Sequence, residues 1–149
     1  MKLCEYLERG FLIPDLAART KSEVLAELVV PLAGAIPGLD AGRAVKVLSE
    51  REGLGTTGIG DGVAIPHGKM DSLEKIVVVV GRSLSGVEFE ALDHKPCSIF
   101  FLVLAPEQVT GLHLRILAHV SRLLRDENFR RAFMEADGVD GLWSLLNAA

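Results

Sequence analysis

The sequence predicts an α/β fold with three layers: a single domain in which helices cover both faces of a mixed β-sheet. Two runs, Ile76–Val80 (IVVVV) and Ser98–Ala105 (SIFFLVLA), are continuously apolar rather than alternating. Strands of this kind are buried on both faces, which requires helices above and below the sheet. Helical periodicity before and after these runs supplies those helices. The length of 149 residues suits one domain, so we assign residues 1–149 to it.

The first helix is predicted to begin after Thr20, because Thr20 and Glu23 have the spacing of a capping box. The apolar residues that follow share one helical face: Leu25, Leu28, Val29 and Leu32. Pro31 has no N–H group to donate to the helix, so we expect it to kink or end this helix.

A second helix is predicted from Asp40, a favourable N-cap residue, to Gly53, which is placed to end it. Its inward residues are Ala41, Ala44, Val45 and Leu48. Short strands are expected at Val63–Ile65 and Val87–Phe89. Three helices are expected after the second long strand: Gly111–Leu124, Glu127–Ala136 and Gly141–Asn147.

The composition argues against several classes of protein. The formal net charge of −4 gives no basic excess to neutralise phosphates, so no nucleic-acid partner is expected. Cys4 and Cys97 lie far apart and form no CxxC pair, which is typical of reduced thiols. The N-terminus lacks the apolar core of a secretory signal, and the longest apolar stretch is broken by prolines and glycines. We therefore expect a cytoplasmic protein with no direct membrane insertion.

Two motifs resemble catalytic signatures but lack their context. Gly53–Gly58 (GLGTTG) matches G-x-G-x-x-G, yet a helix precedes it and no long helix can follow it, so a dinucleotide site is rejected. Gly81–Gly86 (GRSLSG) lacks the spacing of a nucleophile elbow, and we interpret its serines as turn residues. No HxH or HExxH spacing is present, and few carboxylates lie near His67, so no metal site is predicted.

Three of the four histidines lie outside the glycine-rich segment. His94 lies in a polar turn, and His119 shares a helical face with arginines, so both are interpreted as solvated and inert. His113 lies on the inward face of its helix and in the first turn, if Thr110 is the cap. A helix N-terminus favours a neutral imidazole and attracts anions. A core histidine bonded to a backbone group is an equally good interpretation of His113.

His67 has the most distinctive setting. The segment Gly53–Lys69 contains six glycines, and such a run indicates tight turns or a close approach of the backbone. Pro66 stiffens the chain before His67 and Gly68 removes bulk after it, which favours a functional imidazole over an inert surface residue. Arg51 ends the preceding helix, where it either complements the helix dipole or grips a phosphate as a bidentate fork. Two histidines and an arginine together suggest a phosphoryl group.

Two segments resemble a known family. The segment Ser49–Lys69 (SEREGLGTTGIGDGVAIPHGK) is similar to the active-site segment of enzyme IIA domains of the bacterial phosphoenolpyruvate-dependent phosphotransferase system. The similarity is to the fructose/mannitol class, which includes the nitrogen-regulatory enzyme IIA proteins. Pro106–Asp126 (PEQVTGLHLRILAHVSRLLRD) resembles that family's second-histidine segment. The resemblance covers nearly the whole chain and implies a single α/β domain with a mixed sheet.

The resemblance also implies a site and a reaction. The family's phosphorylated histidine falls on His67, its second active-site histidine on His113 and its arginine on Arg51. The implied partners are an HPr-like phosphocarrier, or its nitrogen-branch equivalent, as donor and an enzyme IIB domain or regulatory proteins downstream. No cofactor is implied, because the phosphoryl group arrives on the donor protein. No fused IIB or membrane segment is present, which we take to favour the regulatory branch, although separate sugar-transport IIA proteins keep that role open.

Overall fold

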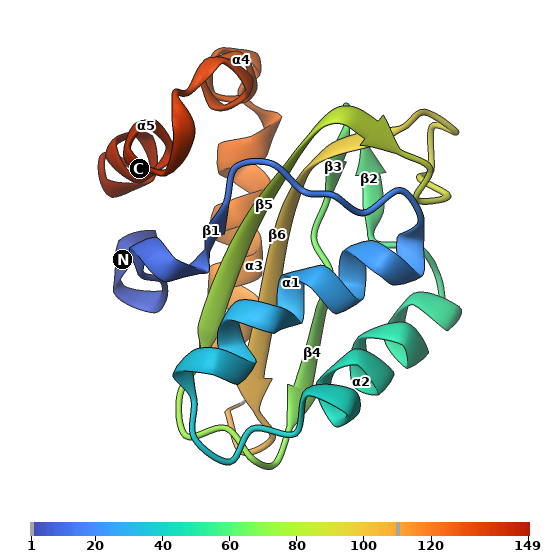
Figure 1. The fold of residues 1–149 in the computed structure, drawn as a ribbon, viewed down its shortest axis with the longest axis vertical. Coiled ribbons are helices and arrows are strands. Elements are labelled where there is room, and N and C mark those ends of the chain that lie inside the picture. Colours follow the sequence, from blue (N-terminus) through green and yellow to red (C-terminus); the bar gives the residue numbers. More distant parts are fainter. Residues whose placement is uncertain (1, 110) are drawn as a thin grey trace.

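The computed structural model describes residues 2–109 and 111–149, and it confirms a mixed sheet between layers of helices (Figure 1). Helices α1 (Lys21–Ala35) and α2 (Ala41–Gly53) lie in front of the sheet in this view, and α3 (Leu112–Arg125) lies behind it. Helices α4 (Glu127–Glu135) and α5 (Gly138–Asn147) continue from α3. The short 3-10 helices η1 (Leu3–Tyr6) and η2 (Arg9–Phe11) pack against α5, so the two ends of the chain lie close together.

The described part of the chain forms a six-stranded sheet around one central strand. The strands are β1 (Leu12–Ile13), β2 (Gly58–Gly60), β3 (Val63–Ala64), β4 (His67–Met70), β5 (Val77–Val87) and β6 (Cys97–Pro106). Strand β6 is antiparallel to β5 on one side, and on the other side it is parallel to β3 and then to β4. Strands β3 and β4 therefore line the same edge of β6 in succession. His67, the first residue of β4, pairs with Val103 near the middle of β6.

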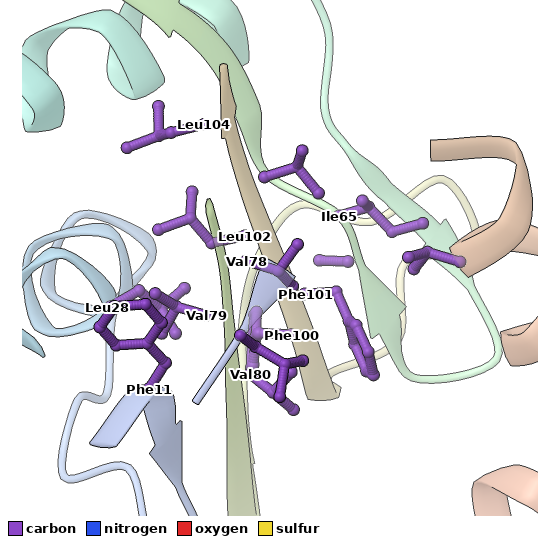
Figure 2. Close-up of a cluster of buried hydrophobic side chains, with 14 of the residues drawn as sticks. Phe11, Leu28, Ile65, Val78, Val79, Val80, Phe100, Phe101, Leu102 and Leu104 are labelled. Carbon is purple, nitrogen blue, oxygen red and sulfur yellow. The ribbon is translucent and has the colours of Figure 1, made fainter. Parts of the chain in front are cut away.

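The two long strands are buried on both faces, as their unbroken apolar runs predict. Residues 77–83 of β5 are all buried, and so are residues 99–106 of β6. Side chains from these strands interlock with those of neighbouring elements, among them Phe11, Leu28 and Ile65 (Figure 2). A Cβ at Gly68 would lie 2.6 Å from Val47 of α2, so Gly68 allows α2 to pack closely on β4.

The first helix begins where predicted, and of the two expectations for Pro31, a kink or an end of the helix, the end is wrong. Thr20 and Glu23 form a full capping box, and the predicted apolar face is buried. The helix does not end at Pro31: it continues to Ala35, and Ile36 N–H donates to the Leu32 carbonyl. Leu32 is fully buried, and its tertiary packing outweighs the loss of one helical hydrogen bond at the proline.

The remaining boundaries agree with the sequence in outline. Asp40 caps α2 by accepting a bond from Arg43 N–H, and Gly53 is its last residue. The interpretation of the Gly81–Gly86 serines as turn residues is wrong, because β5 continues through them to Val87. The Ser83 hydroxyl accepts from Gly86 N–H at a register shift, which lets the strand absorb a local irregularity. Phe89, expected in a short strand, lies just beyond β5.

The helices after β6 begin and end close to the expected residues. The N-cap of α3 is Gly111, which has no side chain to cap it, and Thr110, the expected cap, lies outside the described residues. Asp126 caps α4 by accepting from Asn128 N–H. Among the described residues, no helix is both long enough and apolar enough to cross a bilayer.

Candidate functional site

His67 is the first residue of β4, and its orientation follows from the alternation of a strand. Gly68 faces α2, so the side chains of His67 and Lys69 belong to the opposite face, which α3 covers. The imidazole is half-buried, and its Nδ1 lies 2.9 Å from the carbonyl oxygen of Ile65. A carbonyl can only accept, so this contact assigns a proton to Nδ1, and in the neutral ring Nε2 then has the lone pair.

A cavity of about 160 Å³ lies beside His67. It is lined by Arg51, Thr56, Thr57, Ile59, Ile65, His67, Leu117 and Ser121. The structure thus brings Arg51 and His67 to one cavity, although 16 positions separate them in the chain (67 − 51). No carboxylate is among the described lining residues, so the wall of the cavity presents no acidic side chain to an anion. The Arg51 Nη1 donates to the Gly55 carbonyl at 2.8 Å, which holds the guanidinium over the glycine loop.

The glycines of this loop chiefly allow contacts within the protein. A Cβ at Gly58 would lie 2.9 Å from Ala91, and Gly60 and Gly62 have positive φ angles that glycine adopts without strain. Several loop N–H groups are already bonded: Thr57 to the Glu52 carboxylate, and Gly58 to the Thr56 hydroxyl. The loop therefore holds its own shape with these N–H groups, and the Thr56 and Thr57 hydroxyls are likewise bonded within the protein, to the Phe89 carbonyl and to the Glu52 carboxylate.

His113 lies in the first turn of α3 and close enough to Lys69 and His67 to feel their charges. Burial of the ring lowers its pKa below the usual value, and the positive charge of Lys69, together with that of His67 whenever its ring is protonated, lowers the pKa further. Its Nδ1 is enclosed without a hydrogen-bond partner. The alternative interpretation of His113 as a core histidine requires a bond to a backbone group, and Nδ1 makes none. His113 does not itself line the cavity.

Sequence reasoning assigned no role in the site to three residues that the structure brings near His67. Lys69 is two residues after His67 in β4, and the period of a strand places it on the same face. Leu117 and Ser121 follow His113 at four and eight positions, the spacing of one helical face. The signal was present in each case, because a periodicity argument started at either histidine reaches these residues.

The other two histidines lie elsewhere. His94 is exposed at a turn with a φ of 61°, as its polar setting predicts. His119 neighbours Arg115 and Arg122 as expected, but its ring is only half-exposed and its Nε2 is enclosed without a partner. The prediction that His119 is solvated is therefore wrong for this nitrogen. Its helical face also carries the buried Ile116, three positions earlier, and the half-buried Leu123, four positions later.

The cysteines and the possible metal ligands of the described residues do not form a second candidate site. Within residues 2–109 and 111–149, no three histidine, cysteine or carboxylate side chains gather as metal ligands. Cys4 and Cys97 are free thiols, as their spacing predicts. Burial raises the pKa of the Cys97 thiol to about 11, so it is a weak nucleophile at neutral pH.

An imidazole with a free Nε2, beside an arginine and a lysine and with no carboxylate lining the cavity, has the composition of a phosphoryl-group acceptor site. Residues 5–149 match the family described as "Phosphoenolpyruvate-dependent sugar phosphotransferase system, EIIA 2". The chain belongs to this family, and it is a phosphotransfer component, a phosphocarrier, of the phosphotransferase system.

Relatives from both branches of the family resemble this chain. A "Nitrogen regulatory protein" of Bradyrhizobium diazoefficiens is 38% identical over 146 residues, covering 98% of this chain and 95% of the relative. A "PTS system fructose-specific EIIA component" of Haloferax volcanii is 42% identical over 124 residues, covering 83% and 79%. The crystal structure of Nitrogen Regulatory Protein IIA-Ntr from Neisseria meningitidis superposes with a TM-score of 0.89 at 30% identity, covering 95% and 97%.

Proposed function

We propose that His67 is the residue that carries the phosphoryl group and that Nε2 is the atom to which phosphorus is bound. The hydrogen bond from Nδ1 to the Ile65 carbonyl, at 2.9 Å, carries this proposal. It fixes one tautomer and leaves the lone pair of Nε2 available for attack. A neutral imidazole in a fixed tautomer is a competent nucleophile near neutral pH.

The transfer balances without an external acid or base. The Nε2 lone pair forms the new N–P bond in line with the N–P bond of the donor's phosphohistidine, which breaks. The donor ring keeps the proton on its other nitrogen and leaves as neutral imidazole, and His67 keeps its proton on Nδ1. The ring of His67 gains positive character as the bond forms, and the Ile65 carbonyl stabilises that charge through the same hydrogen bond.

Two cationic side chains and one neutral imidazole, each from a different element, stabilise the oxygens of the transferring group. Arg51 approaches from the end of α2, Lys69 from β4 and His113 from the start of α3. The lowered pKa of His113 keeps its ring neutral at pH 7, so it acts as a hydrogen-bond donor. Such donors act most strongly where negative charge spreads over the phosphoryl oxygens in the transition state.

Exposed apolar side chains around the cavity provide a surface on which a donor protein docks. Leu54 follows Arg51, Ile59 lines the cavity, and Leu114 is next to His113; all three are exposed. An HPr-like phosphocarrier seated on these residues brings its phosphohistidine to Nε2. The acceptor downstream is an enzyme IIB domain or, in the nitrogen-regulatory alternative, a protein whose binding depends on the phosphorylation state. Similarity over nearly the full length of a nitrogen regulatory protein supports that alternative.

Intact mass measurement tests the proposal. Wild type and His67→Ala are incubated with phosphoenolpyruvate, enzyme I and HPr, and separately with the nitrogen-branch phosphocarrier. We expect one acid-labile phosphoryl adduct on wild type and none on His67→Ala, because only His67 supplies the acceptor nitrogen. An adduct that persists on His67→Ala would refute the assignment. Transfer of the adduct to an IIB domain from the same cell supports the relay, and partner capture that differs between the two proteins supports the regulatory alternative.

A further inference from the structure

We propose that Glu52 is a positioning residue for the phosphoryl transfer proposed above: through Thr57 and Ile65 it holds the tautomer and orientation of the His67 ring. This inference rests on the proposed role of His67, although its main test does not require phosphorylation. Glu52 is the residue after Arg51, yet it faces away from the cavity and into the protein. Its function therefore has to be exerted through other residues.

The Glu52 carboxylate is buried and fully engaged. The residue is 8% exposed, and Lys21 Nζ at the start of α1 lies 3.0 Å from Oε1. The same Oε1 accepts from Thr57 N–H at 3.0 Å, and Oε2 accepts from the Thr57 hydroxyl. A carboxylate at this depth is stable only when it is paired and hydrogen-bonded, and Lys21 and Thr57 meet that requirement. The end of α2, the start of α1 and the glycine loop are joined at this point.

The contacts continue from Thr57 to the imidazole. Ile65 N–H donates to the Thr57 carbonyl at 3.1 Å, and the Ile65 carbonyl accepts from His67 Nδ1 at 2.9 Å. The path from Glu52 to His67 thus consists of three consecutive hydrogen-bonded contacts. Thr57 and Ile65 are 4% and 5% exposed, so water cannot readily replace a bond lost along the path.

Loss of the Glu52 carboxylate has a defined consequence for the ring. Both Thr57 donors lose their acceptor, and the strand segment that presents the Ile65 carbonyl loses the partner that holds it. When that carbonyl moves away, the Nδ1–H tautomer loses its stabilising bond, and the Nε2–H tautomer becomes populated. A ring with the proton on Nε2 has no lone pair there and cannot attack phosphorus. The side chains of Leu54, Ile59 and Leu114 are exposed and take no part in these hydrogen bonds, so we expect donor binding to be preserved.

The test compares Glu52→Ala and Glu52→Gln with Glu50→Ala, which removes a carboxylate from the exposed face of the same helix. Two quantities are measured: the ¹⁵N chemical shifts of the His67 ring in unphosphorylated protein, and kcat and KM for transfer from the phosphorylated HPr donor. For Glu52→Ala we expect a mixture of the two tautomers and a fall in kcat of about 10- to 100-fold with KM unchanged. Glu52→Gln restores most of kcat, because its amide oxygen accepts from Thr57 N–H. Glu50→Ala behaves as wild type.

The outcomes separate the two proposals. Wild-type shifts and kcat in Glu52→Ala would overturn the positioning role, and so would a raised KM with kcat unchanged. If Glu52→Ala does not fold, Thr57→Val decides, because it removes only the hydroxyl that Glu52 accepts from; unchanged His67 shifts in that variant would also overturn the role. If wild type is never phosphorylated, the proposed function fails, while the ring shifts still report whether Glu52 controls the tautomer.

Discussion

The two sides of α3 carry one histidine each, and the two differ in what faces them. His113 and His119 are both half-buried, and each encloses one ring nitrogen without a partner. On the side of His113, the residues across from the helix are Lys69 and His67 of β4. On the side of His119, the cavity is lined by residues of α3 itself, among them Arg115 and Arg122. An imidazole on α3 thus faces His67 and a lysine of β4 on one side, whereas on the other side it lies beside a cavity lined by arginines of α3.

This difference shows that neither the burial of a histidine nor an unpaired ring nitrogen identifies a site. The chemistry depends on the element packed opposite, which for α3 is set by the position of β4 beside the second half of β6. The site is where the end of α2, the start of β4 and α3 converge. Matched substitutions on the two sides of α3 are therefore the most direct test of the assignment of the site to the side of His113.

The largest change after loss of His67 itself is expected from Arg51→Ala. We expect the fold to persist and the rate of transfer to fall roughly 100-fold or more, the cost of removing one charged donor from a developing anion. Single-turnover transfer from the phosphorylated donor measures this. The matched control is Arg122→Ala on the far side of α3, which removes the same charge and leaves the rate as in wild type. Equal effects of the two substitutions would indicate that general positive charge, and not Arg51, assists the transfer.

His113→Ala and His119→Ala compare the two sides directly. His113→Ala is expected to slow transfer roughly 30-fold, about the value of one hydrogen bond to a charged group. His119→Ala is expected to change neither phosphorylation nor fold. The same single-turnover assay measures both variants. If His119→Ala matched His113→Ala, the assignment of the two helical sides would be wrong.

Much of this arrangement could be predicted from the sequence, and the gaps have physical causes. The unbroken apolar runs predicted a sheet buried on both faces, and the spacing of Thr20 and Glu23 predicted the start of α1. The continuation of α1 past Pro31 could not be read locally, because it depends on tertiary burial of Leu32. The local settings of His67, His113 and Arg51 suggested a phosphoryl site, and the family resemblance gave each residue a role that remains a prediction. The buried contact between Glu52 and Thr57 could not be predicted from the sequence. A glutamate in a helix is normally exposed, and only the tertiary fold places Glu52 in the interior.

The exposed apolar residue on the His113 side separates docking from chemistry. Leu114 is 59% exposed, and Leu114→Ser is expected to raise KM for the donor protein about 10-fold while kcat stays unchanged, because a residue at the rim contributes to binding only. Val30→Ser is the matched control, since Val30 is 66% exposed on α1, across the sheet. Steady-state kinetics at varied donor concentration measure the effect. A fall in kcat without a change in KM would place Leu114 in the chemistry.

The smallest expected effect is on stability, and it follows from the lowered pKa of His113. Burial lowers this pKa below the unfolded value of about 6.5, so the unfolded chain binds more protons between the two values. The free energy of unfolding therefore rises with pH through that window, and the contribution is fully present above about pH 6.5 and lost as pH falls through the window. Urea unfolding between about pH 5 and pH 8 should show a shallower rise for His113→Gln than for wild type. The same substitution at His119 controls for removing an imidazole from this helix. Equal slopes for wild type and His113→Gln would mean that neither burial nor the charges of β4 lower the pKa of this ring, and the comparison between the two sides of α3 would lose its electrostatic basis.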